Sequence, residues 1–588
     1  MRYAYLVLVD WRIQAGQAWY SEPATRLKAS GMRPRWQAGA SSVLASVDTP
    51  IVDMPRGGLI IGDLYFRDGE RIVGAGQLPT LSSISAVRDY ILSNCWGDYI
   101  LVQPVLGEQR ALTVTRSPSH ACELPCLYTL NVNGSFVTSD VTLGIRAGLY
   151  QRRVDYKSIA HCLIYPNLKT SRTALSGISE LLPGLTLHLS DVSATLARHW
   201  DPWDFVRPDM RYEDRNEAAS AIRSSVEMVV KSLADLDQSV LLELSGGLDS
   251  SIIGACLKRS SARVSYTTMM APVPGADERE YAAAVASMLG VELLEIELGF
   301  DDAAFDFPLP QELVSPSVGP LQYAVDSLLQ SSAVRCEANS FFSGAGGDAV
   351  FGYLTSAAPA ADAFMAAGVG TGLRSIVDLS TFHQCTYWKV GRLALRKMLR
   401  KMLRKTQQYK ADLSLVSPQL RAPEPDLHPW LIHPPQALPG DRQRIADLST
   451  AQAYKDTGLR SFVKPIRMPL LSQPVIETCL RIPSWMWFHD GQNRAVARQA
   501  FSDRLPQKVI ARKSKGTLTA YLGALHRRRK HEITNFLADG QLQAHGLVDA
   551  DALRRLEEHE QVQDDSSFMR LFQLCALENW VRQQSRYP

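Results

Sequence analysis

The amino-acid sequence predicts an antiparallel, β-rich N-terminal domain followed by a C-terminal domain built on a doubly wound parallel sheet, so that the chain combines the α+β and α/β classes. Three observations support this prediction. The length of 588 residues implies more than one hydrophobic core. Residues 1 to about 205 consist of short apolar or alternating runs, and strand-like and helix-like segments alternate from residue 239 onward. We therefore predict two domains, 1–208 and 209–588.

The N-terminal domain contains five apolar or alternating runs that end close to Gly, Asn, Asp, Ser or Pro. These runs predict β-strands at 3–10, 57–66, 98–107, 130–139 and 185–190. Prolines interrupt the pattern between 201 and 210, and a segment rich in Ala, Glu and Arg then predicts a helix over 213–236. This change of pattern marks the domain boundary.

The C-terminal domain shows apolar runs separated by amphipathic segments. The runs predict strands at 239–244, 264–270, 291–298 and 340–344, and the segments between them predict helices at 251–259 and 278–289. Residues 418–440 contain seven prolines, which predicts an extended surface connection. Helical apolar spacing over 568–581 predicts a helix in the core.

The composition is that of an ordinary globular protein. Hydrophobic residues make up 46% of the chain, and the net charge of only +3 is too small for a protein that binds nucleic acid or a membrane with its whole surface. No apolar run approaches the ~20 residues that span a bilayer, and no signal peptide is visible. The nine cysteines are scattered without metal-ligand spacing. We expect a cytoplasmic protein with reduced thiols that is not transmembrane.

One local charge cluster departs from this balance. Residues 392–410 contain eight basic residues and no acidic one, and apolar residues recur at helical spacing at Leu395, Leu399, Met402 and Leu403. The pattern predicts an amphipathic cationic helix. Its apolar stripe either packs on the domain, leaving a solvated basic face, or forms a docking surface for an acidic peptide, a partner protein or anionic lipid.

The sharpest motif is SGGLDS at residues 245–250, between a predicted strand and a predicted helix. Its two glycines allow close backbone approach, and the exposed N–H groups at a helix start attract a pyrophosphate. The motif lacks the lysine of a Walker loop, which favours cleavage between the α- and β-phosphates. The alternative is an ordinary tight strand-to-helix turn.

This motif resembles the pyrophosphate loop of ATP pyrophosphatases, and together with SGAGGD at 343–348 it makes the chain resemble the asparagine synthetase family. The resemblance implies that Asp249 and Asp348 hold Mg²⁺, a role that suits hard carboxylate oxygens. It implies that ATP and pyrophosphate are bound by Leu244, Ser245, Gly246, Gly247, Asp249, Ser250, Ser343 and Gly344. Residues 512–516 (RKSKG) resemble the family's late loop, whose lysine contacts the phosphates and the acyl-adenylate. We favour Lys515 for this catalytic role and keep Lys513 as the alternative; both could also be solvated surface lysines.

The N-terminal domain resembles the family's glutaminase domain through GDY at 97–99, RSP at 116–118 and ELLPG at 180–184. The resemblance implies an Ntn-type sandwich of the glutamine-amidotransferase kind. Members that hydrolyse glutamine carry a cysteine directly after the initiator Met, whereas this chain has Arg2. Cys95 is internal and is expected to be a buried apolar residue. We therefore expect a degenerate amidotransferase domain and a nucleophile that belongs to the substrate.

Family members with this loss include β-lactam synthetases and lasso-peptide cyclases, which activate a carboxylate with ATP for attack by an amine of the same molecule. Residues 467–474, 481–483 and 491–494, and the long insertion between Asp348 and Pro469, most resemble the cyclases. The resemblance implies an AMP-forming ligase that closes a macrolactam in a ribosomally made precursor peptide, with a leader peptidase and a leader-binding protein as partners. The alternatives are an asparagine or β-lactam synthetase-like ligase acting on a small molecule, and an RNA-modifying enzyme.

The third position of SGAGGD departs from two of these families. Asparagine synthetases carry Glu there and β-lactam synthetases carry Tyr, but this chain has Ala345, which cannot accept a proton. The general base for the attacking amine therefore cannot be carried over. Glu477 and Glu578 are only generic candidates, because a glutamate in such a helical segment is more often a carboxylate on the helix surface.

Overall fold

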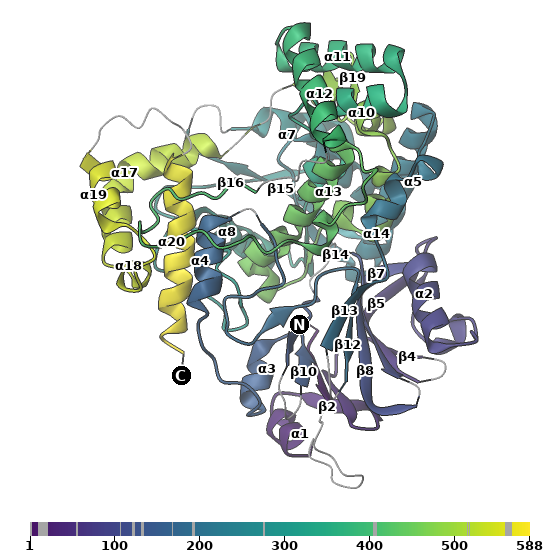
Figure 1. Cartoon of the computed structure of the whole chain (residues 1–588), viewed down its shortest axis with the longest axis vertical. Helices are drawn as coiled ribbons and strands as arrows, with labels where there is room; N and C mark the ends of the chain where they lie inside the picture. Colours follow the sequence, from purple (N-terminus) through teal and green to yellow (C-terminus); the bar gives the residue numbers. More distant parts are fainter. Residues whose placement is uncertain are drawn as a thin grey trace.

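The computed structural model describes residues 3–9, 21–54, 57–105, 107–119, 124–130, 135–166, 168–190, 194–273, 277–403, 409–513, 516, 518–558 and 567–587. Two antiparallel sheets lie at one end of the molecule, and the helices that surround a parallel sheet make up the rest (Figure 1). Residue 208, the predicted boundary, begins the short 3₁₀ helix Pro208–Met210 between these two parts.

The two N-terminal sheets contain only antiparallel pairs. The first has the strand order β11 (Ser179–Glu180), β9 (Leu127–Thr129), β10 (Ser135–Thr138), β1 (Tyr5–Val9), β3 (Ser41–Ser46), β2 (Met32–Ala38). The second has the order β13 (Ala194–Arg198), β12 (Leu185–Leu189), β8 (Glu108–Arg116), β7 (Cys95–Val105), β5 (Leu59–Phe66), β4 (Ile51–Asp53), with β6 (Arg71–Ile72) also paired to β5. The five strands that the sequence predicts in this region are confirmed as β1, β5, β7, β10 and β12.

Alternation along these strands explains how the sheets pack. Val7 of β1 shares one buried core with Ile100 of β7, so the two sheets face each other as a sandwich. Leu6 and Leu8 point to the other face of β1 and join the main core of the molecule. On the outer face of the second sheet, α2 (Ile84–Asn94) buries Ile91 in a third core. Three further helices belong to this region: α1 (Ser21–Lys28), α3 (Val141–Arg146) and α4 (Tyr156–Ile164).

The C-terminal domain contains a five-stranded parallel sheet; the sequence predicts the parallel sheet and four of its strands, but not the fifth at 466–467. Its strand order is β16 (Leu293–Glu297), β15 (Arg263–Met270), β14 (Ser239–Glu243), β17 (Ser340–Phe342), β18 (Ile466–Arg467). The helices before and between the first four strands are α5 (Arg215–Asp237), α6 (Leu248–Leu257), α7 (Arg279–Leu289) and α8 (Pro320–Arg335). The chain adds strands on one side of β14 and then on the other, so β14 and β17 form the switch point at which open α/β sheets bind ligands.

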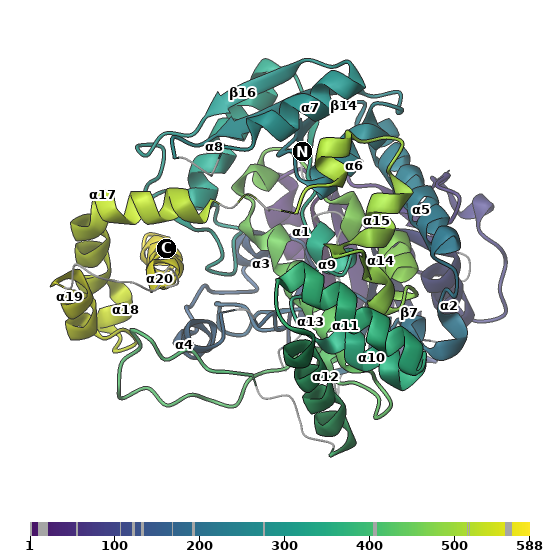
Figure 2. The same ribbon diagram turned by 90° about the horizontal axis from the view of Figure 1, so that it is seen from above.

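The insertion between β17 and β18 is mainly helical. It comprises α9 (Gly347–Val350), α10 (Ala358–Ala366), α11 (Val369–His383), α12 (Tyr387–Met402) and α13 (Pro439–Ala451), and Figure 2 shows α10, α11 and α12 grouped together. The expected surface connection over 418–440 is wrong in one part, because His428 and Trp430 are fully buried. Trp203 Nε1 donates a hydrogen bond to the Trp430 carbonyl (2.8 Å), which ties this segment to the chain that follows the sandwich.

The predicted cationic helix is confirmed as α12, and the alternative in which its Leu and Met stripe packs on the domain is wrong. Val390 and Ala394 are its buried side chains, whereas Leu395, Leu399 and Met402 are exposed. Leu403, which follows the helix, is exposed too, and residues 404–408 lie outside the described residues. Val390 and Ala394 of α12 therefore face the body of the protein with Met398 partly buried beside them, whereas Leu395, Leu399 and Met402 face solvent.

In its described part, the chain after β18 supplies the hairpin β19 (Phe488–His489)–β20 (Gln492–Asn493) and seven α-helices. These are α14 (Gln473–Leu480), α15 (Ala495–Ala500), α16 (Gln507–Ile510), α17 (Thr519–Ala538), α18 (Gln541–Ala544), α19 (Ala550–Glu558) and α20 (Ser567–Gln584). Leu574 and Trp580 of α20 are fully buried, which confirms the predicted core helix. Across the described ranges, no helix combines the length and the apolar character that crossing a bilayer requires.

Candidate active site

Two loops that are distant in sequence meet at the carboxyl ends of the two central strands. The SGGLDS loop follows β14 and the SGAGGD loop follows β17, and the strands pair in parallel with Leu242 opposite Phe342. Parallel pairing places both loops at the same edge of the sheet, at the switch point. The topology therefore brings the two predicted motifs together.

The glycines of the two loops are required by close contact. A Cβ on Gly344 would lie 2.6 Å from the Ser250 nitrogen, and a Cβ on Gly347 would lie 2.3 Å from the Asp249 carboxyl carbon. Gly246 has a φ of +72°, and its Cβ would lie 2.6 Å from the Ala282 nitrogen. Any side chain at these positions would separate the loops or distort the backbone.

The loops border a cavity of about 360 Å³. Its lining includes most of the residues that the sequence predicts for ATP and Mg²⁺: Ser245, Gly247, Asp249, Ser250, Ser343, Gly344 and Asp348. Leu244 is buried behind the loop, where its N–H donates to the Thr267 carbonyl (2.7 Å). Lys513 is outside the residues that line the cavity although Arg512 and Gly516 are among them, and Lys515 lies outside the described residues.

Local hydrogen bonds hold the SGGLDS loop open toward the cavity. The Ser245 N–H donates to Ser250 Oγ (3.2 Å), and the two serine hydroxyls lie 3.0 Å apart. The Ser251 hydroxyl donates to the Gly247 carbonyl (2.7 Å) at the start of α6. A helix that begins at Leu248 presents the positive end of its dipole to the cavity, which favours an anion there.

Asp249 and Asp348 converge on a single cationic atom. Arg494 Nη1 lies 3.2 Å from both carboxylate oxygens of Asp249 and 3.0 Å from Asp348 Oδ1. Arg494 is buried and has a φ of +53°, a left-handed conformation that is uncommon outside glycine. Its guanidinium stands where the two carboxylates would hold a metal, so the donor set fits Mg²⁺ and the arginine is a stand-in for the cation.

Three arginines of the cavity were missed by the sequence analysis. Besides Arg494, these are Arg512, which lies over the Tyr281 ring (3.8 Å to its centroid) and donates to the Gly246 carbonyl (3.3 Å), and Arg498. Arg498 donates to the carbonyls of Asn493, Val509, Ile510 and Arg512, and burial lowers its pKa to about 10. Arg494 and Arg512 lie in two segments that the sequence singles out, 491–494 and 512–516, but their partners Asp249 and Gly246 are distant in sequence, so neither arginine was assigned a role. Arg498 has partners within 14 positions but belongs to no motif.

The generic general-base candidates do not reach the cavity. Glu477 accepts from Trp200 Nε1 (2.8 Å) and pairs with Arg67 (2.6 Å), which joins α14 to the N-terminal domain. Glu578 is fully buried and accepts from the N–H groups of Gln541 and Leu542, which begin α18. Both are buried structural carboxylates, so the surface interpretation is wrong as well.

Two other glutamates line the cavity. Glu278 accepts from the Gly516 N–H (3.1 Å) and pairs with Arg512. Glu243 ends β14, and its carboxylate lies 3.8 Å from Arg460. Ala345 also lines the cavity and supplies no polar group.

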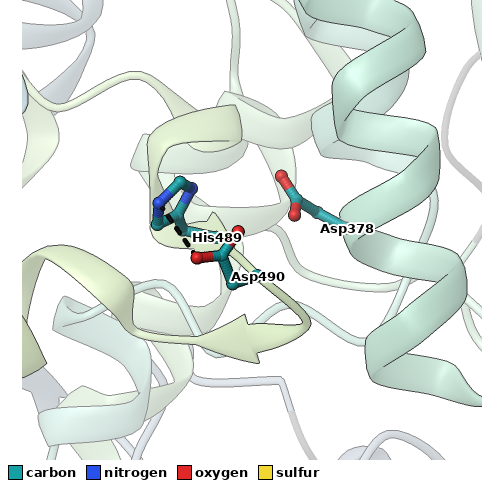
Figure 3. Close-up of side chains that lie close together, drawn as sticks. All are labelled: Asp378, His489 and Asp490. Carbon is teal, nitrogen blue, oxygen red and sulfur yellow. Dashed lines mark ion pairs between the residues drawn. The ribbon is translucent and has the colours of Figure 1, made fainter.

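A second, larger cavity of about 960 Å³ lies beside the insertion and the 203–215 segment. At its edge, ligand atoms of Asp378, His489 and Asp490 lie within 4.8 Å of one another (Figure 3). Arg215 can only donate to His489 Nδ1 (3.2 Å), so Nε2 carries the proton that faces Asp490 (3.4 Å). Asp378 accepts the N–H groups of Asp490 and Gly491. These contacts indicate that Asp378, His489 and Asp490 stabilise the β19–β20 turn.

The described cysteines of the N-terminal domain are poor nucleophiles. Cys95 and Cys126 are fully buried, which confirms the expectation for Cys95. Burial raises the pKa of Cys95 to about 12 and that of Cys162 to about 11. These thiols stay protonated near neutral pH. Arg2 lies outside the described residues.

Comparison with known proteins adds the following findings. Among solved structures, the chain is similar to "structure of the allosteric regulatory enzyme of purine biosynthesis" (11% identity, TM-score 0.20, 50% of this chain and 74% of that chain). It is also similar to the glutamine phosphoribosylpyrophosphate amidotransferase from B. subtilis complexed with ADP and GMP (11% identity, TM-score 0.20, 51% and 85%). No curated protein sequence matches the chain. The asparagine synthase family profile matches residues 221–582, which is more than half of the sequence and contains both loops, and the chain therefore belongs to the asparagine synthase family.

Proposed function

We propose that this protein is an AMP-forming ligase that closes a macrolactam in a ribosomally made lasso peptide, by joining the peptide's N-terminal amine to an Asp or Glu side chain. Membership of the asparagine synthase family implies an ATP-dependent, amide-forming ligase. The observation that carries the AMP-forming part is the convergence of Asp249 and Asp348 on one cation position beside an anion-binding loop. Such a site suits the metal and the pyrophosphate of ATP.

In the proposed adenylation step, different residues of the cavity have different roles. The SGGLDS loop binds the phosphates through its N–H groups and hydroxyls, and Asp249 and Asp348 would hold Mg²⁺, which would neutralise charge on the pyrophosphate. An oxygen of the acceptor carboxylate attacks the α-phosphorus, the bond to the β-phosphate oxygen breaks, and pyrophosphate leaves. Arg498 and Arg512 line this space and stabilise the anionic groups there. The product is an acyl-adenylate, which has a good leaving group.

The second half-reaction needs an amine and a proton acceptor. The amine nitrogen attacks the acyl carbon, the acyl–oxygen bond breaks, AMP leaves, and the amine loses a proton. We assign this proton to Glu243, because its ion pair with Arg460 is long (3.8 Å), whereas Glu278 is held by a shorter ion pair with Arg512 and by the Gly516 N–H. The protonated thiols of the N-terminal domain support an amine that comes from the substrate rather than ammonia released from glutamine.

The larger cavity supports a substrate of peptide size. Its volume of about 960 Å³ is at the upper end of the range for small-molecule sites, and aromatic side chains such as Trp203 and Trp485 line it. Phe488 and His489 of the β19–β20 hairpin contact this cavity, and Arg494, just after the hairpin, contacts the ATP cavity. A prefolded peptide held there would have its ring-closing groups oriented for one intramolecular step.

The test combines the purified protein, ATP, Mg²⁺ and the leaderless precursor peptide. We expect AMP and pyrophosphate, and a peptide that has lost one water and resists carboxypeptidase. With the full-length precursor, the reaction should need the leader peptidase and the leader-binding protein. Asp249→Asn and Asp348→Asn should abolish adenylation, whereas Asp551→Asn on exposed α19 should not.

Each alternative predicts a different outcome. Release of ADP would contradict the AMP-forming assignment. A peptide that stays linear while asparagine forms from aspartate and ammonia would make the protein an asparagine synthetase. Tight tRNA binding that weakens steeply with salt would instead favour RNA modification.

A further inference from the structure

A row of large apolar side chains is exposed on two neighbouring helices of the insertion. We call it the α11–α12 ridge; its members are Val369, Leu373 and Val377 of α11 and Trp388, Leu395, Leu399 and Met402 of α12. Trp388 is 89% exposed and Met402 is 73% exposed. Within each helix the members are three, four or seven residues apart, so they share one face.

The two stripes of the ridge meet where the helices touch. A Cβ on Gly391 of α12 would lie 3.6 Å from Ile376 Cδ1 of α11. Ile376 lies beside Val377 and three residues after Leu373, and Gly391 lies between Trp388 and Leu395. The exposed residues of both helices therefore flank one contact and form a continuous apolar surface.

The opposite face of α12 attaches the helix to the protein. Val390 and Ala394 are buried there, so the ridge is directed away from the core. In Figure 1 α11 and α12 lie at the end of the molecule farthest from the two antiparallel sheets. A contiguous exposed apolar surface of this kind marks an interaction site in a globular protein.

Basic residues accompany the ridge. Lys389, Arg392, Arg396 and Arg400 are exposed on α12, and the sequence contains no acidic residue between Asp378 and Asp412. The complementary surface must be anionic. Pairing with a second copy of this helix would bring like charges together and is disfavoured for that reason.

We propose that the α11–α12 ridge docks the protein on an anionic lipid bilayer. Trp388 and the leucines would enter the boundary between headgroups and acyl chains, and the exposed arginines would contact lipid phosphates. The shape of the surface favours a bilayer over an acidic peptide: the ridge projects from the molecule, and none of its residues lines either cavity described above. Peptides that bind through apolar anchors need a groove.

Vesicle sedimentation with the full-length protein tests this proposal. We expect binding to phosphatidylglycerol vesicles, weak binding to phosphatidylcholine vesicles, and loss of binding as salt rises. Trp388→Glu combined with Leu399→Glu should weaken binding by about tenfold or more, and so should Arg392→Glu combined with Arg396→Glu. The matched controls, Val73→Glu with Leu196→Glu and Lys258→Glu with Arg259→Glu, change exposed residues elsewhere and should bind like the wild type.

Two results would overturn the proposal. The first is equal or absent binding of the wild type to the two kinds of vesicle, which is independent of any variant. The second is binding of poly-glutamate through the ridge without vesicle binding, which would identify an acidic peptide as the partner. ATP–pyrophosphate exchange should be unchanged in all variants, because the ridge lies outside the ATP cavity, and it reports that each variant is folded.

Discussion

Replacing Arg494 should reveal a competition between this arginine and the metal. Its Nη1 bridges Asp249 and Asp348 at 3.0–3.2 Å, so a divalent cation can enter only when the guanidinium moves. We predict that Arg494→Gln tightens binding of Mg²⁺ or Mn²⁺ in the absence of nucleotide. The same variant should be less stable than the wild type in a chelator, because two facing carboxylates lose their counter-ion.

The size of the effect follows from distance and burial. Two unit charges about 4 Å apart interact by about 4 kcal/mol at an effective dielectric constant near 20. The Asp249 and Asp348 side chains are 17% and 31% exposed, so solvent screens part of this interaction, and we take about 2 kcal/mol as the net value. A loss of about 2 kcal/mol corresponds to a change of about 30-fold in the metal dissociation constant.

Electron paramagnetic resonance of free Mn²⁺ measures this affinity directly without nucleotide. Arg494→Lys is the matched control, because a lysine keeps the positive charge near both carboxylates and should stay close to the wild type. Thermal unfolding in a chelator should show a lower midpoint for Arg494→Gln, and added Mg²⁺ should restore it. An unchanged or weaker Mn²⁺ affinity in Arg494→Gln would refute the competition.

Three further predictions test the packing of the site and the core. Gly344→Val should abolish ATP binding, because its Cβ would lie 2.6 Å from the Ser250 nitrogen; Gly319→Ala, which has open space around it, should bind ATP normally in calorimetry. Glu477→Ala should lower the free energy of unfolding by about 3 kcal/mol in denaturant titrations, because Arg67 and Trp200 lose their shared partner. An unchanged free energy of unfolding would show that these contacts do not stabilise the joint between α14 and the N-terminal domain. Burial lowers the pKa of His428 from 6.5 to about 4, so its neutral form is favoured in the folded state and stability is lost as pH falls from 6.5 toward 4. Between pH 7 and pH 5, His428→Asn should therefore lose about 2 kcal/mol less stability than the wild type, and equal losses would show that His428 is not the titrating group.

The strands and the two loops were predictable because their signals are local. Apolar runs with period two or with flanking helices identify β1, β5, β14 and β17, and SGGLDS and SGAGGD each lie directly after a strand. Parallel order then places both motifs at one sheet edge. The sequence also indicates that the loops need glycine for close backbone approach. Only the structure shows that a Cβ on Gly347 would collide with the Asp249 side chain.

The roles of Arg494 and Arg512 were not predictable because their partners are distant. Arg494 and Asp249 are 245 positions apart and meet only because the β19–β20 hairpin returns the chain to the end of β14. Hydrophobic periodicity and secondary-structure propensity are local signals, so they do not predict that this hairpin lies beside the end of β14. The orientation of α12 escaped for another reason: helical spacing identifies an apolar stripe but does not say which stripe is buried. Here Val390 and Ala394 allow close packing, and the larger Leu and Met stripe remains outside.

The residues of the cavity also explain why roles in the proposed adenylation are easier to assign than the base for the attacking amine. In the proposed reaction, adenylation would depend on groups at the strand ends, and the two motifs supply them. Removal of a proton from the amine would depend on another carboxylate of the cavity, because Ala345 cannot accept a proton. Within the described lining of the cavity, Asp249 and Asp348 are held by Arg494, and Glu278 is held by Arg512 and Gly516. Glu243 forms only a longer ion pair, with Arg460 at 3.8 Å, which is why the proposed base is a residue that no motif contains.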